Sequence, residues 1–295
     1  NALYGERAVR ALETNGFTVK KFVFPHGETS KNGETYLRLV QFAAEQRLTR
    51  ADTIVALGGG VVGDLAGFAA ATYLRGIPYI QVPTPLLAMV DSSVGGKTAI
   101  DLPAGKNLAG AFWQPSFVLC DIDCLDTLPE EIFRDGCAEV IKYAVLYDPG
   151  LFAKLEQMIL GFSLEDVISR CVIHKARVVI QDEFDTGERM KLNLGHTIGH
   201  AIEAASHFTV SHGQAVAIGM AIVARSCGCP DASRIEALLK AFGLPVTTDI
   251  PAQTLLGYTL SDKKRSRNSV RMILPNAIGS CRMEDIPVSQ LQSFI

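Results

Sequence analysis

The sequence predicts an α/β N-terminal domain of the Rossmann-like type, followed by an all-α C-terminal domain. Strands alternate with helices as far as Asp121, which is typical of a parallel sheet with helical crossovers. A glycine-rich turn joins one of these strands to its helix, and strand-forming runs almost vanish after Leu128-Pro129. We therefore place the boundary near Cys124–Pro129 and expect domains over residues 1–126 and 127–295.

The elements of the first domain follow from the period of their apolar residues. Helices are expected over Leu3–Asn15, Thr35–Gln46 and Val61–Leu74, and strands over Thr18–Phe24, Thr53–Leu57, Tyr79–Val82 and Phe117–Asp121. Because such a fold normally places a strand before its first helix, we expect further residues before Asn1. In the second domain, helical periodicity predicts the helices Glu130–Leu146, Leu151–Gly161, Leu164–Gln181, His196–Ala205 and Gln214–Ser226.

Composition limits the class of protein. The chain has 295 residues, a net charge of −3 and 48% hydrophobic residues, which excludes a disordered chain and argues against a nucleic-acid partner. The longest apolar stretch, Ala215–Ala224, is far shorter than the ~20 residues of a membrane helix, so no membrane partner is expected. Seven cysteines without a regular framework are typical of reduced thiols, which predicts a cytoplasmic protein.

The glycine-rich turn is the first functional signal. The strand Thr53–Leu57 runs into Gly58-Gly59-Gly60-Val61-Val62-Gly63-Asp64 and then into a helix, which is the G-x-G-x-x-G pattern in its required context. This pattern favours a dinucleotide whose pyrophosphate lies at the helix N-terminus. The acid expected ~20 residues later is absent, since Val82-Pro83-Thr84 stands there, so the geometry would be a variant one. The alternative is a turn without ligand, in which Asp64 only caps the helix.

Two lysines lie beside glycines in a region that we expect to be loop-like. Val94–Thr98 resembles the end of a P-loop, but Asp91 stands where that pattern needs a glycine. Lys97 and Lys106 are suited to contacts with a phosphate or carboxylate group, although a surface lysine is the common alternative for either one alone.

Histidines and acids in the second domain predict a metal site. His196, His200 and Glu203 share one helix face at i, i+4 and i+7, and His212 follows after a turn. The three histidines form a plausible zinc set, but the spacing leaves open which of them bind. Glu139 and Lys142 share another helix face, for which a surface salt bridge is the alternative interpretation.

Seven segments, taken together and in order, resemble the 3-dehydroquinate synthase family of sugar phosphate cyclases across nearly the whole chain. The segments are Gly58–Phe68, Tyr73–Gly76, Val90–Thr98, Gly105–Leu108, Ala138–Tyr143, Asn193–Glu203 and His212-Gly213. The resemblance implies an NAD-binding α/β domain joined to a helical metal domain, with the active site in the cleft between them.

The resemblance also implies roles for individual residues. The metal, Zn²⁺ with Co²⁺ as the alternative, would be held by Glu139, His196 and His212, while His200 matches a substrate-site histidine. Substrate contacts are implied for Asp91, Lys97, Asn107, Lys142, Lys175, Arg189, Asn193 and one of Lys263 and Lys264. Arg75 matches an arginine that reaches a neighbouring subunit's substrate phosphate, which implies a homodimer. Cofactor positions are Glu28, Lys31, Gly59, Gly60, Val61, Asp64, Thr84, Pro85, Lys106, Leu125 and Thr127.

Two positions depart from the family pattern. Pro85 replaces the second threonine of a common Thr-Thr pair, so one cofactor hydroxyl contact is lost, and Asp101 stands where asparagine is usual.

The implied reaction, of the shikimate pathway, converts 3-deoxy-D-arabino-heptulosonate 7-phosphate into 3-dehydroquinate and phosphate. In the family, NAD transiently oxidises the substrate, phosphate is eliminated, the hydride returns, and an intramolecular aldol step closes the ring. His200 is a candidate proton shuttle. The alternatives are another sugar phosphate cyclase, a metal-dependent polyol dehydrogenase, and a non-catalytic NAD-binding module with a structural zinc.

Overall fold

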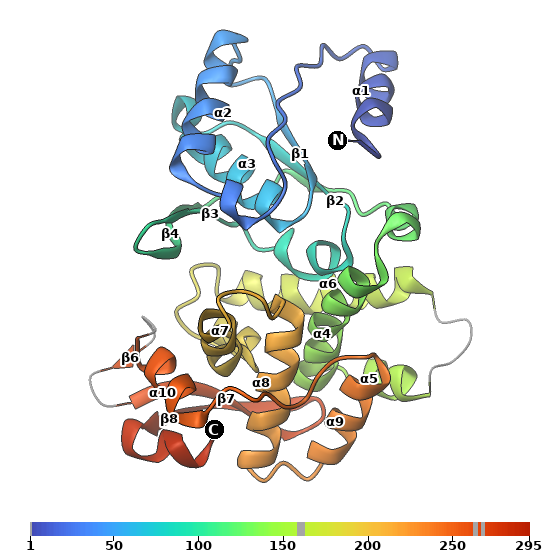
Figure 1. The fold of residues 1–295 in the computed structure, drawn as a ribbon. Helices are drawn as coiled ribbons and strands as arrows, with labels where there is room; N and C mark the ends of the chain where they lie inside the picture. The colour runs from blue at the N-terminus through green and yellow to red at the C-terminus, as the bar shows by residue number, and fades with distance from the viewer. Residues whose placement is uncertain (1, 158–162, 262–264, 267–268) are drawn as a thin grey trace. The chain divides into compact units, whose positions relative to one another are not determined.

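The structure is a computed structural model that describes residues 2–157, 163–261, 265–266 and 269–295. It consists of two compact units, Asn1–Asp126 and Thr127–Ile295 (Figure 1).

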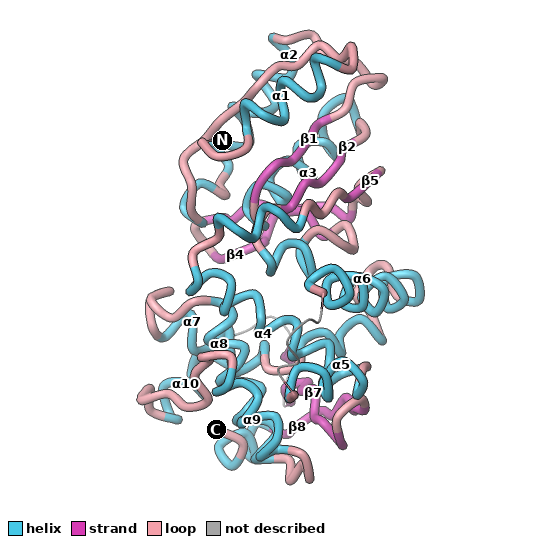
Figure 2. The backbone as a smooth tube through the Cα atoms, turned by 90° about the vertical axis from the view of Figure 1, so that its right-hand side faces the viewer, coloured by secondary structure: helices cyan, strands magenta, loops and turns pink. Residues whose placement is uncertain are grey.

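The first unit is an α/β unit built on a three-stranded parallel sheet in the order β1-β2-β5. Figure 2 shows these strands side by side, with α3 lying against them. Small residues of α3 allow this close packing: Ala69 and Ala70 are buried, and a Cβ at Gly67 would collide with Tyr79 of β2 and Thr98 of β3. The elements are α1 (Gly5–Thr14), α2 (Gly33–Glu45), β1 (Ile54–Gly58), α3 (Gly60–Thr72), β2 (Tyr79–Pro83), β3 (Lys97–Leu102), β4 (Gly105–Phe112) and β5 (Phe117–Val118).

Two expectations for this unit were wrong. Thr18–Phe24 is not a strand, because it forms no ladder with β1, yet Phe22 and Phe24 still pack on the cluster of Leu39 and Leu65. The apolar alternation therefore reports burial of one face rather than strand pairing. The region of Lys97 and Lys106 is not a loop but the antiparallel hairpin of β3 and β4.

The second unit is mostly helical, which confirms the predicted fold class. Two helices form its centre: α4 is buried from Gly136 to Leu146, and α8 is buried from Ala215 to Ala224. The long apolar stretch of the sequence is thus the core helix of this unit. Its helices are α4 (Glu130–Tyr147), α5 (Pro149–Glu156), α6 (Leu164–Gln181), α7 (His196–Ala205), α8 (His212–Ser226), α9 (Ala232–Ala241) and α10 (Ala252–Ser261).

The second unit also contains an antiparallel sheet, which the all-α expectation did not include. Its strands are β6 (Arg265–Ser266), β7 (Ser269–Ala277) and β8 (Ser280–Pro287). The run Met272–Leu274 of β7 is buried, and Gly279, at φ +87°, provides the tight turn into β8. Among the described residues, no helix has the length and apolarity needed to cross a membrane.

Candidate active site

Three helices of the second unit bring together the predicted metal ligands. Glu139 lies on α4, His196 is the first residue of α7, and His212 is the first residue of α8. The Nε2 atoms of His196 and His212 lie 3.4 and 3.5 Å from Oε1 of Glu139. One ligand atom from each residue falls within 4.8 Å of the other two. Two imidazole nitrogens and a carboxylate are a donor set that Zn²⁺ accepts in sites with an open position.

Oxygen acceptors orient both imidazole rings. Nδ1 of His196 lies 3.0 Å from the carbonyl oxygen of Leu194, and Nδ1 of His212 lies 3.5 Å from Oε1 of Glu203. A proton on each Nδ1 leaves the Nε2 lone pair directed at the site, as in many metal-bound histidines. Glu203 had no role in the sequence interpretation, although its position seven residues after His196 on one helix face was the available signal.

The charges around the site favour a cation. Burial lowers the pKa of His196 well below its ordinary value. Burial also lowers the pKa of His212, but the carboxylates of Glu139 and Glu203 outweigh this effect and raise it to about 10. The excess of negative charge that holds a proton on His212 would equally attract a divalent metal ion. The donor set therefore fits the metal that the sequence predicts.

Four predicted substrate residues of this unit lie in buried or partly buried positions: Lys142, Lys175, Arg189 and Asn193. Lys142 is buried on α4 and forms an ion pair with Glu139, so this pair is not a surface salt bridge. Lys175 is buried on α6, and the Arg189 guanidinium donates from Nη1 to the Glu183 carbonyl at 2.6 Å. Asn193 donates to the Met190 carbonyl at 2.9 Å.

His200 lies on the exposed side of the same histidine group. Its ring centroid is 5.5 Å from that of His196 and 6.4 Å from that of His212. The structure thus brings His200 to the edge of the candidate metal centre, while Glu139 at the centre is almost fully buried.

The glycine-rich turn of the first unit opens α3 at Gly59, its N-cap residue. Gly58 has φ +155°, and a Cβ there would lie 2.7 Å from the Val62 side chain, so the turn requires glycine. Pro85 packs across from Gly59, where a Cβ would approach its Cγ to 3.4 Å. The Thr84 backbone N–H donates to the Gly58 carbonyl at 3.0 Å, and Gly60 and Val61 form the first turn of α3.

Lys31 forms ion pairs with acidic residues of this unit, two of which are predicted cofactor positions. Its Nζ lies 2.8 Å from Glu28, 3.2 Å from Asp64 and 3.8 Å from Asp101, while Lys106 lies 3.9 Å from Glu28. Burial raises the pKa of Asp64 to about 6, although the Lys31 ammonium opposes it. Asp64 is therefore part of an ion cluster, and it is not the cap of α3, whose N-cap residue Gly59 has no side-chain cap.

The remaining predicted residues of the first unit lie at its turns and hairpin. Asp91 lies in the π-helical turn Ala88–Ser92, and Lys97 is the first residue of β3. Asn107 has φ +53°, and its N–H donates to Asp101 at 2.8 Å. Arg75 is exposed at φ +66°.

Leu125 and Thr127 lie in the 3₁₀ turn Ile122–Thr127. Lys263 and Lys264 lie outside the described residues.

Comparison with known proteins places this fold and site in a class. Family models for the N-terminal and C-terminal parts of 3-dehydroquinate synthase match residues 21–135 and 136–265. A solved structure of 2-epi-5-epi-valiolone synthase from Streptomyces hygroscopicus, with NAD⁺ and Zn²⁺ bound, is 26% identical with a TM-score of 0.90, covering 99% of this chain and 86% of its own. A 2-deoxy-scyllo-inosose synthase complexed with carbaglucose-6-phosphate, NAD⁺ and Co²⁺ is 28% identical with a TM-score of 0.85, covering 97% and 85%. Fold and site thus define a sugar phosphate cyclase.

Curated relatives narrow the class to one family. The 3-dehydroquinate synthase of Pelobacter propionicus is 50% identical over 98% of this chain and 84% of its own length. That of Picosynechococcus is 46% identical over 96% and 82%. The chain belongs to the 3-dehydroquinate synthase family, which confirms the resemblance seen in the sequence.

Proposed function

We propose that this chain is the lyase that converts 3-deoxy-D-arabino-heptulosonate 7-phosphate into 3-dehydroquinate and phosphate, with NAD used catalytically. The observation that carries the proposal is the group of Glu139, His196 and His212, beside which Lys142 is buried and His200 exposed. A metal site alone would need neither Lys142 nor His200, whereas a phosphorylated sugar acid needs cations and a proton carrier.

Glu139, His196 and His212 would hold the metal, which we propose to be Zn²⁺ with Co²⁺ as a substitute. When bound, the metal supplies Lewis-acid polarisation of the substrate hydroxyl and ketone oxygens. Lys142 forms an ion pair with Glu139, which keeps its ammonium group beside the candidate metal site. His200 is suited to carry a proton on a ring nitrogen, because imidazole side chains exchange protons near physiological pH.

The positions around the glycine-rich turn and Lys31 would hold NAD in the first unit. When bound, NAD supplies reversible acceptance of a hydride. The N-terminus of α3 favours the pyrophosphate through its free backbone N–H groups. The cluster of Glu28, Lys31 and Asp64 offers carboxylate and ammonium groups to the hydroxyls of the adenosine side. Pro85 contributes only its ring there, which supports the expected loss of one hydroxyl contact.

The substrate is doubly anionic, and we propose that cations of both units contact it. From the second unit these are Lys142, Lys175 and Arg189, with Asn193; from the first unit they are Lys97, with Asp91 and Asn107. Charged donors bind phosphate and carboxylate oxygens more strongly than neutral ones do. The exposed position of Arg75 supports a contact with a second subunit, and thus a homodimer. All seven cysteines are free thiols, which supports a cytoplasmic location.

The alternatives differ in their support. Other sugar phosphate cyclases share the fold but are less similar, at 26–29% identity against 43–50% for the curated 3-dehydroquinate synthases. Polyol dehydrogenases are represented by the glycerol dehydrogenase of Schizosaccharomyces pombe, whose 18% identity and TM-score of 0.61 indicate the fold alone. We therefore favour the 3-dehydroquinate synthase reaction over both.

One assay tests the proposal. The purified chain is given the heptulosonate phosphate, Zn²⁺ and substoichiometric NAD, and phosphate, 3-dehydroquinate and NADH are followed together. We expect many equivalents of phosphate and dehydroquinate per NAD, without net NADH. Stoichiometric NADH would show a dehydrogenase instead, and turnover of a different sugar phosphate in place of this one would show another cyclase.

A further inference from the structure

Asp135 joins α4 to the beginning of α8. Its Oδ1 accepts hydrogen bonds from the backbone N–H groups of Gly213 at 2.7 Å and Gln214 at 3.2 Å, and from the Ser211 hydroxyl. The same turn has a capping box of its own, made by Ser211 and Gln214. Asp135 is therefore an additional cap, supplied by a neighbouring helix, for N–H groups that a helix leaves unpaired.

This cap holds the residue that begins α8, which is His212. On α4, Asp135 precedes Glu139 by four residues, so both side chains lie on one face of the helix. The helix that carries the carboxylate ligand thus grips the turn that carries one of the two imidazole ligands. The fixed spacing within α4 then sets where His212 stands relative to Glu139.

Gly213 allows the close approach that this contact needs. A Cβ at Gly213 would collide with the carbonyl oxygen of Asp135, which is backbone and has little freedom to move. The docking of α8 on α4 is therefore specified by an acid on one side and a glycine on the other.

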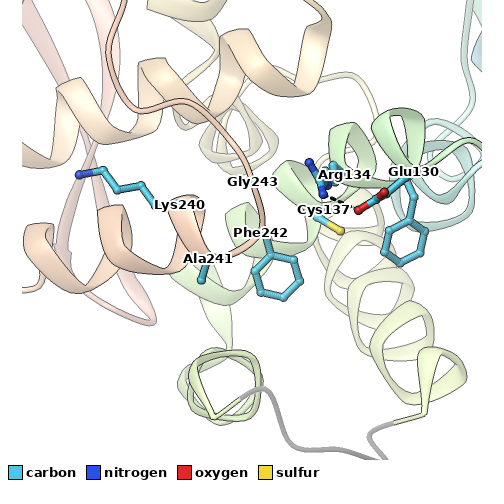
Figure 3. Close-up of a pocket in the computed structure, with 8 residues that line it drawn as sticks. Glu130, Arg134, Cys137, Lys240, Ala241, Phe242 and Gly243 are labelled. Carbon is cyan, nitrogen blue, oxygen red and sulfur yellow. Dashed lines mark hydrogen bonds and ion pairs between the residues drawn. The ribbon is translucent and has the colours of Figure 1, made fainter.

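The opposite face of α4 contacts another part of the chain and not α8. Glu130, Phe133, Arg134 and Cys137 line a hollow of about 310 Å³ together with residues 240–243, as Figure 3 shows. Arg134 points into this hollow and pairs with Glu130, although it is adjacent to Asp135 in the sequence. A substitution of Arg134 thus changes the same turn of the same helix without touching α8.

We propose that Asp135 is a positioning residue, which acts through His212 to hold the metal-binding imidazole against Glu139. The inference rests on the proposed function for the metal ligands, but none of the family's matched segments includes Asp135. Asp135 would not bind the metal itself. It would hold His212 close to Glu139 before a metal ion binds, so that α8 need not move when the ion enters. Removal of a group that orients a metal ligand commonly lowers metal affinity about 10- to 100-fold.

The test measures metal binding rather than activity. Asp135→Ala, Asp135→Asn and the control Arg134→Gln are stripped of metal, and their Zn²⁺ affinity is measured by chelator competition. The absorption spectrum of bound Co²⁺ reports the coordination geometry, and thermal unfolding without metal reports folding. We expect Asp135→Ala to lose about 10- to 100-fold in Zn²⁺ affinity and to alter the Co²⁺ spectrum. Asp135→Asn keeps an oxygen acceptor and should lose less, while Arg134→Gln should match the wild type.

The outcomes separate a positioning role from a structural one. If Asp135→Ala and Asp135→Asn unfold at lower temperature but bind Zn²⁺ and Co²⁺ as the wild type does, Asp135 only stabilises the fold and the inference fails. If Asp135→Ala does not fold, the Co²⁺ spectrum of Asp135→Asn decides in the same way. An affinity that depends on Asp135 in a protein that forms no dehydroquinate would overturn the proposed function and leave this inference standing.

Discussion

The buried Lys31 ammonium lies among three carboxylates, those of Glu28, Asp64 and Asp101. Burial and Lys31 act in opposite directions on the pKa of Asp64. Burial raises the pKa of Asp64 from 3.8 to about 6 in the folded chain, although Lys31 opposes the shift. Between these two values the folded chain holds a proton that the unfolded chain has released. The stability from this group is thus present at low pH and is lost as the pH rises through 6.

We therefore predict that Asp64→Asn changes the pH dependence of unfolding. From pH 7 to pH 5 the wild type should gain about 1 kcal/mol of unfolding free energy relative to the variant, since protonation of Asp64 ends its desolvation cost. Denaturant unfolding at the two pH values measures this. Asp52→Asn is the control, because hydrogen bonds from Thr49 lower the pKa of Asp52, so it titrates below this range. An equal pH dependence of Asp64→Asn and wild type would contradict the shift.

Single residues differ in how far the sequence predicts their place. The spacing of His196 and His200 shows that both lie on one helix face, but it does not show that His212 returns to Glu139. That proximity depends on three helices packing together, and only the family resemblance anticipated it. Glu203 was missed for the same reason, since its role exists only where His212 meets it.

At the scale of elements, α7 and α8 pack closely because glycines face each other between them. A Cβ at Gly219 of α8 would collide with the carbonyl oxygen of Gly195, and a Cβ at Gly195 would lie 2.6 Å from the Val216 carbonyl oxygen. Gly195 also has φ +78°, directly before His196 opens α7. The glycine contacts therefore fix the turn that presents a predicted metal ligand.

Gly219→Ala should separate these helices. We expect a loss of about 1–3 kcal/mol in unfolding free energy, because the clash is with backbone that cannot rotate away. The Zn²⁺ affinity should fall as well, since His196 moves with the start of α7. The control is Gly257→Ala on α10, where a Cβ meets nothing within 4 Å. That variant should gain about 0.5–1 kcal/mol through helix propensity. Equal stability of the two variants in denaturant unfolding would contradict the packing argument.

Helices were predictable from the sequence where the periodicity of a single segment is enough to specify them. The helices Leu164–Gln181 and His196–Ala205 have the bounds that their apolar period predicts. Thr18–Phe24 was mistaken for a strand because alternation records a buried face, whereas a strand also needs a neighbour to pair with. The β3–β4 hairpin and the β7–β8 sheet were missed because their pairing joins residues that no local period connects.

At the scale of the whole molecule, the residues predicted to bind the metal and those predicted to bind NAD belong to different units. Glu139, His196 and His212 all belong to Thr127–Ile295, whereas the glycine-rich turn and the Lys31 cluster belong to Asn1–Asp126. A ligand stabilises the structure that binds it, by about 2.7 kcal/mol at a hundredfold excess over its dissociation constant. The zinc effect and the NAD effect should therefore appear at different places along the chain.

Hydrogen exchange of the full chain measures this division. Zn²⁺ added to the metal-depleted protein should slow amide exchange most in α4, α7 and α8, because it ties together helices that otherwise open independently. NAD should slow exchange most at the end of β1, the first turn of α3 and the residues around Lys31. In His196→Ala the zinc effect should vanish while the NAD effect remains, since this variant removes one metal ligand and leaves the first unit unchanged. Protection of the glycine-rich turn by Zn²⁺ alone, with α7 and α8 unaffected, would overturn the assignment of the metal to Glu139, His196 and His212.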